Sequence, residues 1–276
     1  MTNLKELLAW FDDKKKVLVS LSGGVDSALV AYAAKTKLDK NAIAVTADYK
    51  TLSSEELDSA KNIAKEIGIT HKIIEYSELD NEDFVKNDNK RCFYCRDELS
   101  HKLIQFASSL DIDVIVDGTQ NDDMGDYRPG IDALHGNGIR SPLLETHFTK
   151  DMVRNIAKSI GLSIYDKPSN SCLASRIPWG QRVTAEKLTR IEIGENFIKQ
   201  KTGIRQVRVR DIDGTARIEV ESNNLQLFDD SVVKNDIISK LIMFGFSNVE
   251  IDPDGYRTGK LNILYENLDS WHDAKS

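Results

Sequence analysis

Six residues near the N-terminus, Ser22–Ser27, have the types and spacing that bind the phosphates of a nucleotide: Ser-Gly-Gly-Val-Asp-Ser. An apolar stretch typical of a strand, Val17–Leu21, leads into them, and a helical pattern, Ala28–Lys37, follows. A loop between a strand and a helix points backbone N–H groups and the helix N-terminus at one spot, which stabilises an anion there. Gly23 and Gly24 permit turns that a Cβ would block.

The polar side chains of this loop suit the same ligand. Ser22 and Ser27 supply hydroxyl donors, and Asp26 can hold Mg²⁺ between phosphates. The loop lacks the Gly-Lys-[Ser/Thr] end of a Walker A motif and the G-x-G-x-x-G spacing of a dinucleotide fingerprint. It resembles instead the SGGxDS pyrophosphate loop (PP-loop) of ATP pyrophosphatases, which adenylate a substrate oxygen and release pyrophosphate. The alternative is a glycine-rich turn that binds nothing.

The three cysteines are the second group of reactive side chains. Cys92 and Cys95 form a CxxC pair ahead of a predicted helix, while Cys172 stands alone in a polar segment. An odd number of cysteines argues against a disulfide framework. The pair suits zinc, an iron–sulfur cluster or a redox couple, and it is also compatible with no ligand. No histidine has a familiar metal spacing to Cys172, so the three thiols fit a [4Fe–4S] cluster with one open iron.

Composition places these motifs in an ordinary soluble protein. The chain has 276 residues, of which 40% are hydrophobic and 29% charged, enough for two modest domains. We see no stretch approaching the roughly 20 apolar residues of a membrane span, and no signal peptide at the N-terminus, so we expect a cytoplasmic protein. The net charge of −7 argues against a large nucleic-acid interface, although it allows a local cationic pocket.

Strand-like and helical patterns alternate over the first part of the chain. We expect strands at 17–21, 42–47, 72–75 and 113–116, and helices at 28–37, 53–67, 96–110 and 149–160. Repeated βα units predict an α/β fold, in which helices cover both faces of a parallel sheet and ligands bind at the carboxyl ends of its strands. Ala47–Asp48 and Asp117–Gln120 follow such ends. We therefore expect Ala47 and Gly118 to join the glycine loop in one nucleotide site.

The pattern changes toward the C-terminus, where we expect a second domain. A helix at 184–201, a hairpin of 207–210 and 216–220, a helix at 231–244 and a strand at 249–251 predict a smaller α+β domain. Asp213-Gly214 is a hairpin turn signal between the paired strands. The expected domains are residues 1–180 and 181–276.

Four further motifs resemble the LarE family, and with the SGGVDS loop they span nearly the whole chain in that family's order. Ser171–Gly180 is similar to the family signature S-C-[LVS]-[AS]-S-R-[FI]-P-[YW]-G, and Asp126–Gly130 to its D-Y-R-P-G element. Val207–Arg210 and Gly255–Gly259 match its V-R-V-R and G-[FY]-R-[ST]-G elements.

The resemblance implies an ATP-dependent sulfurtransferase. Its substrate would be pyridinium-3,5-biscarboxylic acid mononucleotide, a carboxylate of which is adenylated and converted to a thiocarboxylate in nickel-pincer nucleotide synthesis. In one branch of the family the sulfur comes from the cysteine that matches Cys172, which becomes dehydroalanine. The Cys92 and Cys95 pair resembles the other branch, in which three cysteines hold a [4Fe–4S] cluster that carries the sulfur.

The resemblance also implies roles for the remaining motifs. The expected catalytic residues are Cys172, Cys92, Cys95 and Asp26. The expected substrate-binding residues are Asp126, Arg128, Arg176, Arg208, Arg210 and Arg257, and the alternative role of Asp126 and Arg128 is to order their loop. Arg208, Arg210 and Arg257 can clamp a phosphate in bidentate fashion, and their alternative is solvated strand edges and turns. ATP, Mg²⁺ and a [4Fe–4S] cluster are the expected ligands, with an unidentified sulfur donor as partner and a homo-oligomer as the assembly.

Three other functions remain open from the sequence. A TtcA-type tRNA thiolation enzyme also combines a PP-loop with CxxC and a third cysteine, but the acidic composition argues against it. An amide-forming ATP pyrophosphatase, similar to NAD or GMP synthetase, would use ammonia and need no cluster. A nonenzymatic iron–sulfur or nucleotide sensor would bind ATP without releasing pyrophosphate.

Overall fold

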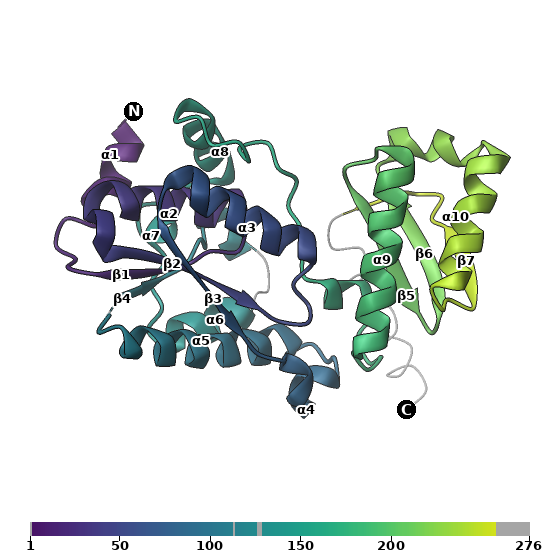
Figure 1. Ribbon diagram of the computed structural model, residues 1–276, viewed down its shortest axis with the longest axis horizontal. Coiled ribbons are helices and arrows are strands. Elements are labelled where there is room, and N and C mark those ends of the chain that lie inside the picture. The colour runs from purple at the N-terminus through teal and green to yellow at the C-terminus, as the bar shows by residue number, and fades with distance from the viewer. Residues whose placement is uncertain (1, 113, 126–128, 258–276) are drawn as a thin grey trace. The chain divides into compact units, whose positions relative to one another are not determined.

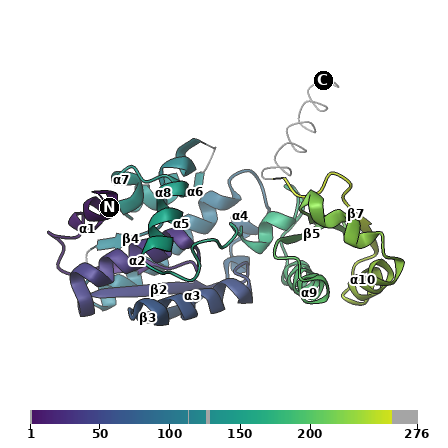
Figure 2. The same cartoon turned by 90° about the horizontal axis from the view of Figure 1, so that it is seen from above.

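The computed structural model describes residues 2–112, 114–125 and 129–257. The chain divides into two compact units (Figures 1 and 2). The first consists of Met1–Asp80 and Lys90–Asn170, and the second of Asn81–Asn89 and Ser171–Ser276. This division differs from the expected boundary after residue 180 at residues 81–89 and 171–180.

A parallel sheet of four strands forms the centre of the first unit, in the order β3-β2-β1-β4. Its strands are β1 (Val17–Ser20), β2 (Ala42–Asp48), β3 (Thr70–Glu75) and β4 (Val114–Val116). Val17 in β1 is in register with Ala42 on one side and Val114 on the other. Because every pairing is parallel, the carboxyl ends of the strands meet at one edge of the sheet. This confirms the predicted α/β fold.

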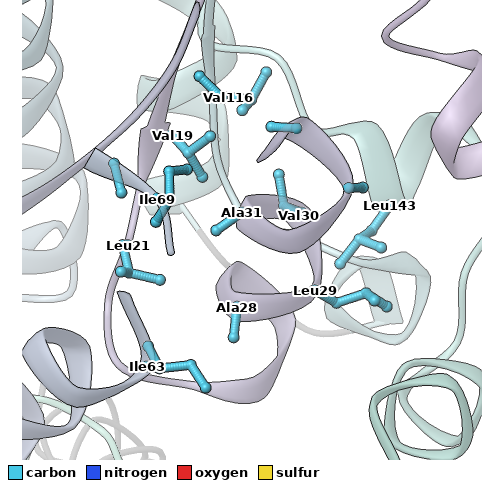
Figure 3. Packing of buried hydrophobic residues seen from close by; sticks show 14 of the residues in the cluster. Val19, Leu21, Ala28, Leu29, Val30, Ala31, Ile63, Ile69, Val116 and Leu143 are labelled. Atoms are coloured by element: carbon cyan, nitrogen blue, oxygen red, sulfur yellow. The ribbon is translucent and has the colours of Figure 1, made fainter. Parts of the chain in front are cut away.

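Helices cover both faces of this sheet (Figure 1). They are α1 (Thr2–Ala9), α2 (Val25–Leu38), α3 (Ser54–Ile67), α5 (Arg91–Ser109), α6 (Pro129–Gly136), α7 (Pro142–Glu145) and α8 (Lys150–Ser159). Successive residues of a strand point to opposite faces. Val17 and Val19 accordingly join a core with α2, α3, α7 and α8, while Leu18 joins a second core with α5 and α6. Figure 3 shows Val19 and Leu21 in the first of these cores.

Helix ends in this unit follow their sequence signals, except at the starts of α2 and α5. The Ser53 and Thr149 side chains cap α3 and α8, and Gly68 ends α3 in the left-handed conformation. α2 begins at Val25 rather than at the expected residue 28. α5 begins at Arg91 rather than at the expected residue 96. No glycine or proline interrupts residues 91–95, so the helix includes the CxxC pair, and the expectation that the pair precedes the helix was wrong.

The second unit contains a three-stranded mixed sheet in the order β5-β6-β7. Its strands are β5 (Val207–Ile212), β6 (Thr215–Val220) and β7 (Asn248–Ile251), and its helices are α4 (Glu82–Val85), α9 (Ala185–Thr202) and α10 (Ser231–Met243). β5 and β6 form the predicted hairpin, whose turn residues Asp213 and Gly214 both have positive φ. The smaller α+β fold is therefore also confirmed.

Short 3-10 helices complete the described elements. They are η1 (Asp39–Asn41), η2 (Glu78–Asp80), η3 (Asn121–Gly125), η4 (Leu173–Arg176) and η5 (Ser222–Phe228). Among all these helices, none is both long enough and apolar enough to cross a membrane.

Candidate active site

The segment Ser22–Ser27 leads from β1 into α2 at the carboxyl edge of the first unit's sheet, and its last three residues form the first turn of α2. The Ser27 hydroxyl accepts a hydrogen bond from the Ser22 N–H at 3.2 Å and donates one to the Gly24 carbonyl at 3.1 Å. The hydroxyls of Ser22 and Ser27 lie 3.1 Å apart. These bonds close the loop around the first turn of α2, whose N–H groups lack intrahelical partners and favour an anion.

Two glycines allow close backbone approaches around this loop. Gly23 has a φ of +80°, and a Cβ there would lie 2.5 Å from the Glu56 carbonyl oxygen. A Cβ on Gly118 would lie 2.6 Å from the Ser27 nitrogen. The loop that follows β4 is therefore packed directly against the start of α2. Ala47, near the end of β2, is buried in the core beside α5.

Asp26, in the first turn of α2, is the acidic group of the loop. One of its carboxylate oxygens pairs with the Lys150 ammonium at the start of α8. The other oxygen, Oδ1, is buried and has no hydrogen-bond partner among the described residues. Burial raises the pKa of Asp26, Lys150 opposes that shift and Asp123 adds to it. An unsatisfied buried carboxylate oxygen of this kind is suited to a divalent cation.

Sequence reasoning missed Lys150, although it predicted that a helix begins at residue 149. The Lys150 backbone N–H donates to the Asp122 carboxylate at 2.8 Å, which fixes the start of α8 beside the acidic residues of η3. A lysine at a helix start has no signal of its own in the sequence. Its role depends on the fold that brings α8 beside Asp26.

Glu56 and Lys167 were also missed, and they hold the loop from its other side. The Lys167 ammonium lies 2.9 Å from the Glu56 carboxylate and donates to the Gly23 carbonyl at 3.0 Å. The Asn170 side-chain amide donates to Glu56 at 3.1 Å. The segment after α8 is thereby connected to both α3 and the glycine loop.

The CxxC pair lies in the first turns of α5. Cys92 is exposed and Cys95 is buried, and neither forms a disulfide. Residues three apart on a helix are surface neighbours, so the two thiols share one side of α5. Gly130 is packed against the same turn, because a Cβ there would lie 3.1 Å from the Cys92 carbonyl oxygen.

Cys172 belongs to the second unit, where it is half-buried just before η4. The Arg176 guanidinium, which is fully buried, donates to the Ser171 carbonyl at 2.7 Å and the Cys172 carbonyl at 3.1 Å. It also bonds both oxygens of Glu195, at 2.8 and 3.0 Å. Burial alone would lower the pKa of Arg176, but the charge of Glu195 raises it above its ordinary value. Arg176 is therefore a charged centre around which the Cys172 loop is built.

The other arginines of the sequence motifs have different surroundings. Arg210 is bound to Glu219 at 2.6 Å and donates to the Ser175 carbonyl at 2.8 Å. Arg208 is buried with its guanidinium 5.3 Å from the centre of the Tyr256 ring. Burial, together with the nearby charge of Arg176, lowers the pKa of Arg208.

For the remaining predicted substrate residues, Arg257, Asp126 and Arg128, the structure gives little or no detail. Arg257 is exposed, and Asp126 and Arg128 lie outside the described residues. Cys92 and Cys95 belong to the first unit and Cys172 to the second. In the part of the chain that the structure describes, no three His, Cys, Asp or Glu side chains are grouped as ligands for a metal ion.

A parallel sheet whose first strand leads through SGGxDS into a helix, with an aspartate at the helix start, defines a PP-loop ATP pyrophosphatase. A sequence profile of the family described as asparagine synthase matches residues 11–110, which include this loop. The chain is 31% identical over 266 residues to the pyridinium-3,5-bisthiocarboxylic acid mononucleotide synthase of Lactiplantibacillus plantarum, covering 95% of this chain and 94% of that protein. The chain belongs to the LarE family of ATP-dependent sulfurtransferases.

Two other relatives define the range of this similarity. An uncharacterized protein of Synechocystis sp. is 40% identical over 261 residues, which cover 95% of this chain and 97% of that protein. A tRNA-specific 2-thiouridylase of Desulforamulus reducens is 26% identical over 197 residues, covering 57% of this chain and 54% of that protein. The match to the tRNA enzyme is therefore partial, whereas the LarE match spans nearly the whole chain.

Proposed function

We propose that the protein adenylates a carboxylate of pyridinium-3,5-biscarboxylic acid mononucleotide and converts it to a thiocarboxylate in nickel-pincer nucleotide synthesis. The observation that carries this proposal is the similarity over 95% of the chain to a synthase of the bisthiocarboxylic acid mononucleotide. The carboxylate attacks the α-phosphorus of ATP and pyrophosphate leaves. A sulfur nucleophile then adds to the acyl-adenylate carbonyl, and AMP leaves.

Groups of the first unit are suited to the adenylation step. The N–H groups at the start of α2, with the hydroxyls of Ser22 and Ser27, stabilise charge on the departing pyrophosphate. The unsatisfied Oδ1 of Asp26 fits Mg²⁺, and Asp123 adds negative charge nearby. When bound, the ion would neutralise phosphate charge. Lys150, paired with Asp26, is close enough to the loop to serve as a further phosphate ligand.

The second unit supplies candidates for the substrate phosphate. Burial and the nearby charge of Arg176 both lower the pKa of Arg208, so the positive charge of its guanidinium lies in an unfavourable environment. A bound phosphate would offset that cost, and the exposed Arg257 offers a second cation. We assign Arg176 and Arg210 instead to shaping the Cys172 loop, since Glu195 and Glu219 bind them.

The three cysteines suit a [4Fe–4S] cluster, because thiolates are the ligands that hold such clusters. None of the three thiols forms a disulfide, two share one side of a helix and the third lies in a loop. Cys92, Cys95 and Cys172 would hold such a cluster, which when bound supplies a carrier for the sulfur. In the absence of a cluster, Cys172 is the candidate for direct sulfur donor. We further propose a small-molecule substrate rather than tRNA, a separate sulfur donor and a homo-oligomer.

The test is an anaerobic reaction of the purified protein with ATP, Mg²⁺, the biscarboxylic acid mononucleotide and sulfide. Mass spectrometry should show replacement of a carboxylate oxygen by sulfur, with release of AMP and pyrophosphate. Pyrophosphate release without any thiolated mononucleotide, or thiolation of added tRNA instead, would contradict the proposal. Iron and acid-labile sulfide, measured in the wild type and in Cys92→Ala, Cys95→Ala and Cys172→Ala, test the cluster separately.

A further inference from the structure

A largely buried ion pair joins three segments of the first unit that are far apart in the sequence. The side chains of Lys167 and Glu56 are only 17% and 11% exposed. Glu56 lies in the first turn of α3, and its two oxygens accept from Lys167 at 2.9 Å and from Asn170 at 3.1 Å. Lys167 also donates to the Gly23 carbonyl at 3.0 Å. One carboxylate and one ammonium thus connect α3, the glycine loop and the segment 167–170.

The glycine loop is held tightly at this point. The Gly23 carbonyl accepts from Ser59 as well as from Lys167, each at 3.0 Å. Gly23 has a left-handed φ, and a Cβ added there would lie 2.5 Å from the Glu56 carbonyl oxygen. Position 23 therefore has no room for a side chain. Because the Ser59 bond and this packing remain when Lys167 is replaced, the backbone of the phosphate-binding loop should stay in place.

The segment held in this way is the one from which the Cys172 loop departs. Asn170 precedes Cys172 by two residues, so their Cα atoms are separated by at most about 8 Å of chain. The end of the first unit, and with it the starting point of the cysteine loop, is fixed to the nucleotide loop through Glu56. Neither Glu56 nor Lys167 is itself a nucleophile in the proposed reaction.

We propose that Glu56 and Lys167 are positioning residues that couple adenylation to sulfur transfer, an inference that rests on the proposed function. The acyl-adenylate has two fates. If sulfur adds to the carbonyl carbon, the bond to AMP breaks and a thiocarboxyl group forms. If water adds instead, the original carboxylate, AMP and a proton result. Loosening the segment 167–170 favours the second fate, because correct positioning of the attacking sulfur is lost.

The experiment compares thiocarboxylate formed per pyrophosphate released in the full-length wild type, Glu56→Gln and Lys167→Met. We expect this ratio to fall about tenfold or more in both variants, while substrate-dependent pyrophosphate release changes much less. Lys167→Arg, which keeps the charge, should recover much of the ratio. The matched control is Glu66→Gln at the other end of α3, where Glu66 accepts from the Ser163 N–H at 2.9 Å, away from the loop.

Equal losses of pyrophosphate release and thiocarboxylate, or an unchanged ratio in both variants, would overturn the inference. The charge-neutral double variant Glu56→Gln/Lys167→Met avoids leaving a single buried charge and provides the same ratio if a single variant fails to fold. Failure of the proposed function looks different: the wild type itself would then form no thiocarboxylate from the mononucleotide, which overturns both.

Discussion

Asp26 in the first unit is a half-buried carboxylate and Glu195 in the second is a buried one, and each is paired with one basic side chain. Both oxygens of Glu195 are bound by Arg176, and one also accepts from the Val209 N–H. Burial opposes ionisation of Glu195, but Arg176 holds its pKa below the usual range. Asp26 has a raised pKa and one oxygen without a partner among the described residues. The satisfied carboxylate holds structure together, and the unsatisfied one is available to a ligand.

The same contrast separates the arginines of the second unit. Arg176, Arg208 and Arg210 all occur in motifs that suit an anion, yet Arg176 and Arg210 are each bound to a buried glutamate. Residue type therefore does not decide whether a charge binds a ligand or another part of the chain. The position of its partner decides, and that partner lies on a different element of the fold.

The largest effect is expected at Asp26. Asp26→Asn removes the charge that fits Mg²⁺, so substrate-dependent pyrophosphate release should fall by about 10²–10³-fold. The variant should stay folded and keep any iron bound by the cysteines. Asp39→Asn is the control, because the exposed Asp39 lies at the other end of α2 and forms its ion pair among the described residues with Lys35. Pyrophosphate release that survives in Asp26→Asn would show that Asp26 is structural, as Glu195 is.

At Glu195 we expect a loss of stability rather than the loss of activity expected at Asp26. Glu195→Ala leaves Arg176 buried without its counter-charge, which should lower the free energy of unfolding by about 3–5 kcal/mol. Urea denaturation measures this loss. Replacing both residues by apolar ones, in Glu195→Leu/Arg176→Leu, should recover much of the stability. A loss below about 1 kcal/mol, as for an exposed ion pair, would remove the distinction between the two carboxylates.

A smaller effect, on ATP binding, is expected at Gly118, where the loop after β4 packs against the start of α2. Gly118→Ala places a Cβ 2.6 Å from the Ser27 nitrogen, and the resulting shift should cost about 1–3 kcal/mol and weaken ATP binding. Isothermal titration with ATP measures the change. Gly136→Ala, with no atom within 4 Å of the added Cβ, should bind ATP as the wild type does. Equal ATP affinities in the two variants would show that the close contact between Gly118 and Ser27 does not shape the ATP site.

The smallest effect is a dependence of stability on pH. Asp26 ionises near its ordinary pKa of 3.8 when unfolded and at a higher pH when folded. Between these two values the folded state holds a proton that the unfolded state has lost, so ionisation of Asp26 lowers stability as the pH rises. The unfolding free energy of Asp26→Asn relative to wild type should therefore increase as the pH rises from about 4. A difference that decreases with pH would mean that Lys150 outweighs burial.

Much of this architecture was predictable because its signals are local. The caps at Ser53 and Thr149, the turn at Asp213-Gly214 and the apolar run of β1 are set by neighbouring residues. Lys150, Lys167 and Glu56 were missed because each acts across more than 100 residues of chain. Their partners follow from the packing of α3 and α8 around the sheet. The start of α5 was placed too late because the cysteines were interpreted as a loop motif.

The most direct measurement compares pyrophosphate release and thiocarboxylate formation in the wild type and in Cys172→Ser. The groups proposed for adenylation lie in the first unit and Cys172 lies in the second. We therefore predict that Cys172→Ser still releases pyrophosphate when ATP and the mononucleotide are present, but forms no thiocarboxylate. Thiocarboxylate formation by Cys172→Ser, or complete loss of its pyrophosphate release, would contradict the division of labour between the two units.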